Sequence, residues 1–161
     1  MPNKLIDFLK KWKLDSLKIN AQFLEVEFSL DSSDREAAWE MYVELLTRVT
    51  TQALQTNHGD EGSALTSVYS IFRVTREILK KYGASNKQFQ KLAILILNQK
   101  IRPFTAKWHP VSLQENGLKE RADEFRHELA ELQVTITHYA RALADMAGVE
   151  DLTGLEDTSG E

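Results

Sequence analysis

Cysteine is absent from this 161-residue chain, and its absence excludes several kinds of chemistry at once. Without a thiol the chain has no disulfide, no thiolate nucleophile and no thiolate metal ligand. Small secreted domains commonly depend on disulfides, so we expect an intracellular, cytoplasmic protein.

Long apolar runs are missing as well. The longest covers residues 92–97 and ends at Asn98, whereas a membrane-spanning helix needs about 18 apolar residues or more. Residues 1–13 carry four lysines and no small-residue cleavage site. We therefore predict neither a membrane span nor a signal peptide.

Familiar catalytic motifs are not found. The sequence contains no His-Glu-x-x-His, no glycine-rich phosphate loop and no Gly-x-Ser-x-Gly, which leaves metalloprotease, P-loop and α/β-hydrolase chemistry without support. Residues 124–127 match the Glu-x-x-His of di-iron helical bundles once, but the second copy that such a site needs is absent. We predict no metal and no cofactor.

What the sequence does contain is an uneven distribution of charge. The net charge is −4, with 42% hydrophobic and 27% charged residues, as expected for one ordinary globular domain. Residues 73–107 hold nine Lys or Arg against the single acid Glu77, while the flanking segments are acidic. Either acidic helices neutralise this basic block internally, or part of it remains exposed to nucleic acid or to an acidic partner protein.

Two short elements are expected near the N-terminus. An amphipathic helix is predicted within residues 1–14 and a β segment within 16–30, either a hairpin or one bulged strand. The helix rests on apolar residues at helical spacing, and the strand on apolar residues that alternate with polar ones: Leu5, Phe8, Leu9 and Trp12 for the helix; Leu24, Val26, Phe28 and Leu30 for the strand. The helix docks on the protein's own core or on another surface.

Four helices are expected over residues 34–149, so the predicted fold class is mainly α, a four-helix bundle on which the N-terminal helix and β segment pack. Ser33 and Glu36 form a capping-box pattern that starts the first helix, about 34–55. Residues 57–59 stop it, and a second helix ends at Gly83.

The third helix is predicted to be capped by Ser85 and to be ended or kinked near Ile101 by Pro103. It is apolar nearly all round over 92–97, as expected of a central helix covered by its neighbours.

The last helix has a coiled-coil-like seam with steps of four and three residues, and it ends at Gly148. The seam consists of Leu118, Ala122, Phe125, Leu129, Leu132, Ile136, Tyr139, Leu143 and Met146. It serves either as core or as a contact for a partner or a second copy. We expect one domain over 1–149 and a mobile acidic tail over 150–161.

The segment 101–110 is the most unusual part of the sequence, because it places Arg102, Lys107, Trp108 and His109 around and between two prolines. Arg102 and His109 resemble the Arg, four to six residues, His motif of HEPN-family ribonucleases, which are also helical. The resemblance implies a metal-independent RNA cleavage in which the His moves a proton and the Arg stabilises phosphorane charge. This chain departs from the pattern at Pro103, where the family usually has a polar residue.

A structural alternative accounts for the same segment. In this interpretation Arg102 is expected to hydrogen-bond unsatisfied carbonyls at the end of the third helix. Phe104 and Trp108 would then fill the end of the bundle, and His109 would bond a loop carbonyl. Together with residues 38–48, the Arg-Pro-Phe-x-x-x-Trp-His segment also resembles a group of small uncharacterised bacterial proteins. Some of these accompany phage-defence genes, which implies a partner-dependent role.

The sequence thus favours a non-catalytic interaction subunit, an accessory or scaffold protein that binds a protein partner or itself. The alternatives are the HEPN-like ribonuclease with Arg102 and His109 as catalytic residues, and a helical protein that binds nucleic acid through the 73–107 basic block. The predicted binding residues are Arg73, Arg76, Lys80, Lys81, Arg102, Lys107, Trp108 and His109.

Overall fold

The computed structural model describes residues 2–48 and 60–156, and this part of the chain is mainly helical, as predicted. The α-helices are α1 Leu5–Lys11, α2 Ser32–Leu46, α3 Glu61–Tyr82, α4 Lys87–Ile96, α5 Arg102–Ser112, α6 Gly117–Glu120 and α7 Ala122–Ala147. Tighter 3-10 turns are η1 Ala21–Phe23, η3 Gly83–Ser85 and η5 Thr153–Glu156, and η4 Leu97–Ile101 is a π-helical turn. None of the helices in the described ranges has the length and apolarity needed to cross a membrane.

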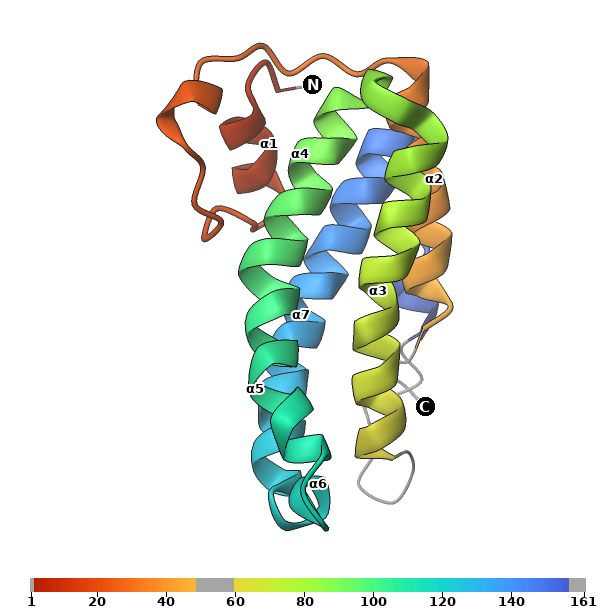
Figure 1. Cartoon of the computed structure of the whole chain (residues 1–161). Coiled ribbons are helices and arrows are strands. Elements are labelled where there is room, and N and C mark those ends of the chain that lie inside the picture. The colour runs from red at the N-terminus through yellow and green to blue at the C-terminus, as the bar shows by residue number, and fades with distance from the viewer. Residues whose placement is uncertain (1, 49–59, 157–161) are drawn as a thin grey trace.

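The long helices run side by side (Figure 1). α4, η4 and α5 follow one another without a break and form a continuous rod, which contacts α3 along one side and α7 along another. α2 packs against α3, α4 and α7. The chain before α2, including α1, lies beside the α4 half of the rod.

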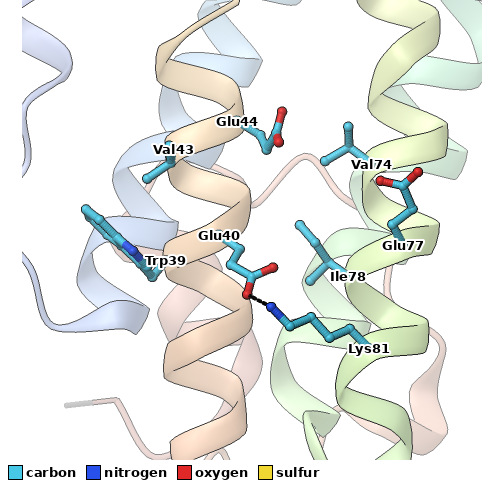
Figure 2. A pocket seen from close by; sticks show the side chains of 8 residues that line it. All are labelled: Trp39, Glu40, Val43, Glu44, Val74, Glu77, Ile78 and Lys81. Carbon is cyan, nitrogen blue, oxygen red and sulfur yellow. Dashed lines mark hydrogen bonds and ion pairs between the residues drawn. The ribbon is translucent and has the colours of Figure 1, made fainter.

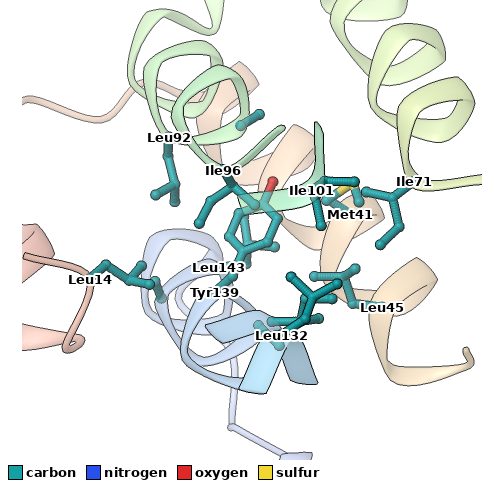
Figure 3. Close-up of a cluster of buried hydrophobic side chains, with 14 of the residues drawn as sticks. Leu14, Met41, Leu45, Ile71, Leu92, Ile96, Ile101, Leu132, Tyr139 and Leu143 are labelled. Atoms are coloured by element: carbon teal, nitrogen blue, oxygen red, sulfur yellow. The ribbon is translucent and has the colours of Figure 1, made fainter. Parts of the chain in front are cut away.

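The core lies between these helices (Figure 3). Apolar side chains from α2, α3, the rod and α7 meet there, and Leu14 reaches in from the N-terminal segment. The seam of the last helix is buried from Phe125 to Met146. It therefore contributes to the core and offers no free stripe to a second copy.

Helix α1 docks on this core. Leu5, Phe8 and Leu9 are each no more than 2% exposed. At its end, Lys11 Nζ and the Trp12 indole N–H both donate to Asp145 Oδ2 of α7, at 3.0 and 2.8 Å. The apolar stripe of the predicted N-terminal helix is thus covered by the protein itself.

The predicted β segment over 16–30 is wrong, since the structure has no strand among the residues it describes. A single antiparallel bridge joins Lys4 to Glu27, and the Phe28 N–H donates to the Asn3 carbonyl at 2.7 Å. Of the alternating side chains, Phe28 is buried whereas Val26 is 40% exposed. Alternation alone makes no strand when no neighbouring segment supplies a ladder of backbone partners.

Two predicted helix starts also differ. The capping box of α2 is formed by Asp31 and Asp34, not by Ser33 and Glu36. Ser85 does not cap α4; its hydroxyl donates to the Tyr82 carbonyl. The carboxylate of Asp34, although part of α2, instead accepts from the N–H groups of Gln88 and Phe89 at the start of α4.

The predicted helix ends at glycine are confirmed. Gly83 follows α3 with φ +60° and Gly148 follows α7 with φ +71°, in the region where glycine is least strained. The first long helix is described only as far as Leu46; its expected end near residue 55 and the stop at 57–59 lie outside the described residues.

Pro103 does not end the helical rod near Ile101. The chain passes through the π-helical turn Leu97–Ile101, and Pro103 falls in the first turn of α5. Proline is tolerated in a first turn because its missing N–H has no obligatory partner there. The π turn supplies this new start without interrupting the rod.

The described part of the acidic tail, 150–156, is held against the helices. The Tyr42 hydroxyl of α2 donates to Asp151 Oδ1 at 3.2 Å and accepts from the Leu152 N–H. Arg141 of α7 lies 3.6 Å from Asp151 Oδ2. Asp151 therefore links α2, α7 and the tail.

Candidate binding groove

A surface groove runs between α3 and α5, and two helical stripes form its walls. Tyr69, Phe72, Arg73 and Arg76 lie at i, i+3, i+4 and i+7 on α3, so they share one face of that helix. On the rod, Arg102, Thr105 and Ala106 form the facing stripe, and Leu97 of the π turn also lines the groove. We call this the arginine groove; its volume is about 520 Å³.

The floor of the arginine groove fixes one guanidinium in place. The Arg102 Cζ lies 5.3 Å from the centroid of the Phe72 ring, and its Nε donates to Asn98 Oδ1 at 3.3 Å. A guanidinium held over an aromatic ring by a cation–π contact keeps N–H groups free to point outward. Arg102 thus presents an oriented cation, with its ring contact on one side and solvent on the other.

His109 lies two helical turns after Arg102, on the same side of α5. Its ring packs edge-on against Tyr69, with the centroids 5.6 Å apart at 74°. His109 does not line the arginine groove. The two residues are about 10 Å apart along the helix axis. Each contacts a different aromatic ring of α3, so their side chains do not meet at one site.

Most cations of the 73–107 block have no acidic partner among the described residues. Arg73 pairs with Glu77 at 3.0 Å, Lys81 pairs with Glu40, and Lys107 pairs with Glu124 and Glu128. The cations for which the described part of the chain supplies no ion pair are Arg76, Lys80, Lys87, Lys91, Lys100 and Arg102. Internal neutralisation is therefore partial, and Arg76 and Arg102 both face the arginine groove.

Lys81 lies in a different groove, between α2 and α3 (Figure 2). There its ammonium bonds Glu40 across the gap between the two helices, and the Tyr82 hydroxyl donates to the same carboxylate oxygen at 2.5 Å. The hydrogen bond to Glu40 raises the pKa of Lys81. Lys80, the residue before Lys81 in α3, is an exposed cation.

Lys107 and Trp108 point away from the arginine groove, toward α7. Hydrogen bonds to Glu128 and Glu124 raise the pKa of Lys107. Trp108 is fully buried, donates its indole N–H to Glu128 Oε2 at 2.8 Å and packs edge-on against Phe125. These two residues hold α5 to α7, and Trp108 is not accessible to a ligand.

Among the residues described, no group of three or more His, Asp or Glu is placed to hold a metal ion. The arginine groove itself presents guanidinium groups beside aromatic rings, which offer charge-assisted, bidentate hydrogen bonds to carboxylate or phosphate, and stacking.

No family model matches the chain, and the searches of curated proteins and of solved structures also give no match.

Tyr69 and Phe72 were not predicted as site residues, because their helical spacing places them among the core positions of the second helix. Tyr69 is 37% exposed, and Phe72 carries the Arg102 guanidinium on its ring. The available signal was that each lies four residues before an arginine, Tyr69 before Arg73 and Phe72 before Arg76, because that spacing puts aromatic and basic side chains on one helix face.

Proposed function

We propose that this protein is a non-catalytic interaction subunit that binds an acidic segment of a partner protein in the arginine groove. One observation carries the proposal: Arg76 and Arg102 face a single groove from two helices and have no acidic partner among the described residues. Guanidinium groups favour carboxylates because two parallel N–H donors match two oxygens.

The arrangement of the long helices is part of this proposal. We interpret α2, α3, the α4–α5 rod and α7 as a four-helix bundle that keeps the two walls of the arginine groove at a fixed separation. A rigid frame lowers the cost of ordering the arginines on binding. The cytoplasmic location and the role beside bacterial phage-defence systems stay predictions from the sequence.

The experiment measures, by fluorescence anisotropy, how tightly a labelled poly-glutamate peptide binds to the purified full chain and to its variants. Arg76→Gln and Arg102→Gln each remove one cation without shortening the side chain to a methyl group. We expect each to weaken binding about tenfold, because hydrogen bonds to charged groups are worth about 1.5–3 kcal/mol. Lys119→Gln, on α6, is the matched control and should leave affinity unchanged. Equal affinity of wild type and both arginine variants contradicts the proposal.

A second candidate is single-stranded RNA, favoured by the two aromatic rings in the arginine groove. Tyr69 and Phe72 provide stacking surfaces next to cations, the combination that binds bases and phosphates without sequence preference. Labelled RNA in the same assay separates the classes. RNA binding that falls steeply with salt, lost in Arg102→Gln, supports this candidate over the acidic peptide.

The same RNA samples test the HEPN-like ribonuclease. Cleavage by wild type that is absent in folded Arg102→Ala and His109→Ala variants would establish that function. Because Arg102 and His109 contact different rings and only Arg102 lines the arginine groove, we expect the RNA to remain intact.

A further inference from the structure

A second and larger groove lies on the other part of the rod, between α4 and the N-terminal segment. Its volume is about 660 Å³, and it shares no lining residue with the arginine groove. Apolar side chains make most of its surface: Leu5, Ile19, Phe23, Ile94 and Leu95. We call it the α4 groove.

One wall of the α4 groove is a helical stripe of α4 and the π turn. The stripe occupies positions i, i+3, i+4, i+7, i+8 and i+11 and is about 16 Å long; it consists of Lys87, Gln90, Lys91, Ile94, Leu95 and Asn98. The sequence predicted that residues 92–97 are covered all round, but Ile94 is 46% exposed. The uncovered apolar surface of the third helix opens into this groove.

The opposite wall is pinned to the rod. The Gln99 side chain accepts from the Lys18 N–H at 2.8 Å and donates to the Lys18 carbonyl at 2.7 Å. Phe23, in η1, is 38% exposed and has the Lys91 ammonium 6.0 Å from its ring centroid. The wall is thus tied to the rod by specific bonds, while the Phe23 ring remains in contact with water.

Every charged residue that lines the α4 groove is a lysine: Lys18, Lys87 and Lys91. Lys87 opens the stripe, Lys91 follows one turn later, and Lys18 lies near the far end, where its backbone meets Gln99. Positive charge is therefore distributed along the length of the groove. A ligand with one acidic head group would use only one of these positions.

We propose that the α4 groove binds an acidic amphipathic helix of a partner protein. Apolar residues of such a helix at i, i+3, i+4 and i+7 would cover Ile94, Leu95 and Phe23, and acidic residues along its flank would meet the lysines. The groove is open on one side, so its occupant needs an outer face that tolerates water. An amphipathic helix has that face, whereas an acyl chain would remain half exposed.

The test uses two synthetic peptides of about three to four helical turns with the same leucine stripe, one with glutamates and one with lysines at the remaining positions. Binding to the full chain is measured by fluorescence anisotropy at several salt concentrations. We expect the acidic peptide to bind and the basic peptide to bind at least tenfold more weakly. Equal binding of the two, or no saturation by the acidic peptide below about 1 mM, overturns the proposal.

Variants locate the site. The double substitution Lys87→Glu and Lys91→Glu should weaken the acidic peptide at least tenfold, and Ile94→Glu should do the same through the apolar wall. Val134→Glu is the matched control, because Val134 is also an exposed apolar residue, 57% exposed, but lies on α7. Each variant is used only after its melting temperature is shown to match wild type. Unchanged binding in Ile94→Glu overturns the proposal.

Other occupants give distinguishable outcomes. Laurate binding without peptide binding would overturn the proposal in favour of a fatty anion. A wild-type dimer that Ile94→Glu converts to monomer in sedimentation would overturn it in favour of a second copy. The proposal does not depend on the arginine groove, since Arg102→Gln should leave the affinity for the acidic helix unchanged.

Discussion

The hydroxyl of Tyr139 is buried in the core among aliphatic side chains and has no hydrogen-bond partner among the described residues (Figure 3). Burial raises the pKa of Tyr139 above its ordinary range, so the group is neutral at any ordinary pH. A buried hydroxyl without a partner loses its bonds to water and regains none. We therefore expect Tyr139→Phe to leave the free energy of unfolding unchanged or to raise it by up to about 1 kcal/mol, measured by urea denaturation.

The matched comparison is Tyr42, whose hydroxyl bonds Asp151 and Leu152 of the tail. Removing it in Tyr42→Phe leaves both groups without this partner, and we expect a loss of about 1 kcal/mol. If both substitutions destabilise the protein equally, the assignment of Tyr139 as unpartnered is wrong.

Asp34 shows the opposite case, a buried carboxylate with several donors. It is 1% exposed, and its Oδ1 accepts from Gln88 N–H at 3.0 Å and Phe89 N–H at 2.9 Å, which joins α2 to the start of α4. Asp34→Ala leaves those two N–H groups unpaired in the interior. We expect it to lower the free energy of unfolding by about 2–4 kcal/mol, whereas Asp34→Asn, which keeps an oxygen acceptor, should lose less.

Asp34 also predicts a pH dependence. Burial raises its pKa, although hydrogen bonds from Phe89 and Asp31 act in the other direction. A raised pKa in the folded state means that the folded protein binds this proton more readily than the unfolded chain. The resulting stability is present below the unfolded pKa of about 4 and is lost as the pH rises through the folded value. Wild type should therefore gain stability relative to Asp34→Asn as the pH falls from 7 through the acid range; a difference independent of pH contradicts this assignment.

At the scale of elements, helix ends marked by glycine could be predicted from the sequence, because Gly83 and Gly148 take positive φ values that other residues avoid. The start of α4 could not, since its cap comes from Asp34, more than fifty residues earlier in the sequence. The β segment failed for a similar reason. Periodicity reports which side chains face a surface, whereas a strand also needs a backbone partner, and residues 2–30 find only one bridge.

The N-terminal segment is instead attached to the rod by the amide of Gln99, which pairs with both backbone groups of Lys18 as a strand would. We expect Gln99→Ala to cost about 1 kcal/mol of global stability and to speed amide hydrogen exchange most at Lys18. Ser112→Ala, on the same rod but distant from residue 18, should leave exchange at Lys18 unaltered. Protection at Lys18 that survives Gln99→Ala would show that other contacts hold the segment.

At the scale of the whole molecule, the charge block could be recognised from the sequence, but not which of its cations remain exposed. Arg102 and His109 lie on one side of α5 because the rod continues past Pro103, which the two prolines in the sequence did not suggest. The exposure of each cation depends on which helix lies next to it. Lys107 pairs with Glu124 and Glu128 of α7, whereas Arg102 and His109 contact aromatic rings of α3. Such pairings depend on packing between distant segments, which composition and spacing do not encode.

Whether the N-terminal helix α1 unfolds together with the long helices or detaches separately is also a property of the whole molecule. Phe8 is fully buried, stacks on Phe28 with the ring centroids 4.7 Å apart, and belongs to the same buried cluster as the long helices. If α1 is part of one cooperative core, Phe8→Ala should lower the free energy of unfolding by about 3–5 kcal/mol, as for other large-to-small core substitutions. Val134→Ala, at an exposed site on α7, should change it by less than about 0.5 kcal/mol.

The decisive measurement is whether unfolding in urea occurs in one transition or in two. Tryptophan fluorescence includes Trp12, which bonds Asp145 of α7, and far-ultraviolet circular dichroism reports the long helices. Coincident urea transitions for wild type and a coincident shift in Phe8→Ala indicate one cooperative unit that contains α1. A fluorescence change at low urea that precedes loss of helix would instead show that α1 and the wall of the α4 groove detach first. In that event the groove would form only when the N-terminal segment is docked, and acidic-helix affinity should fall in Phe8→Ala in proportion to the undocked fraction.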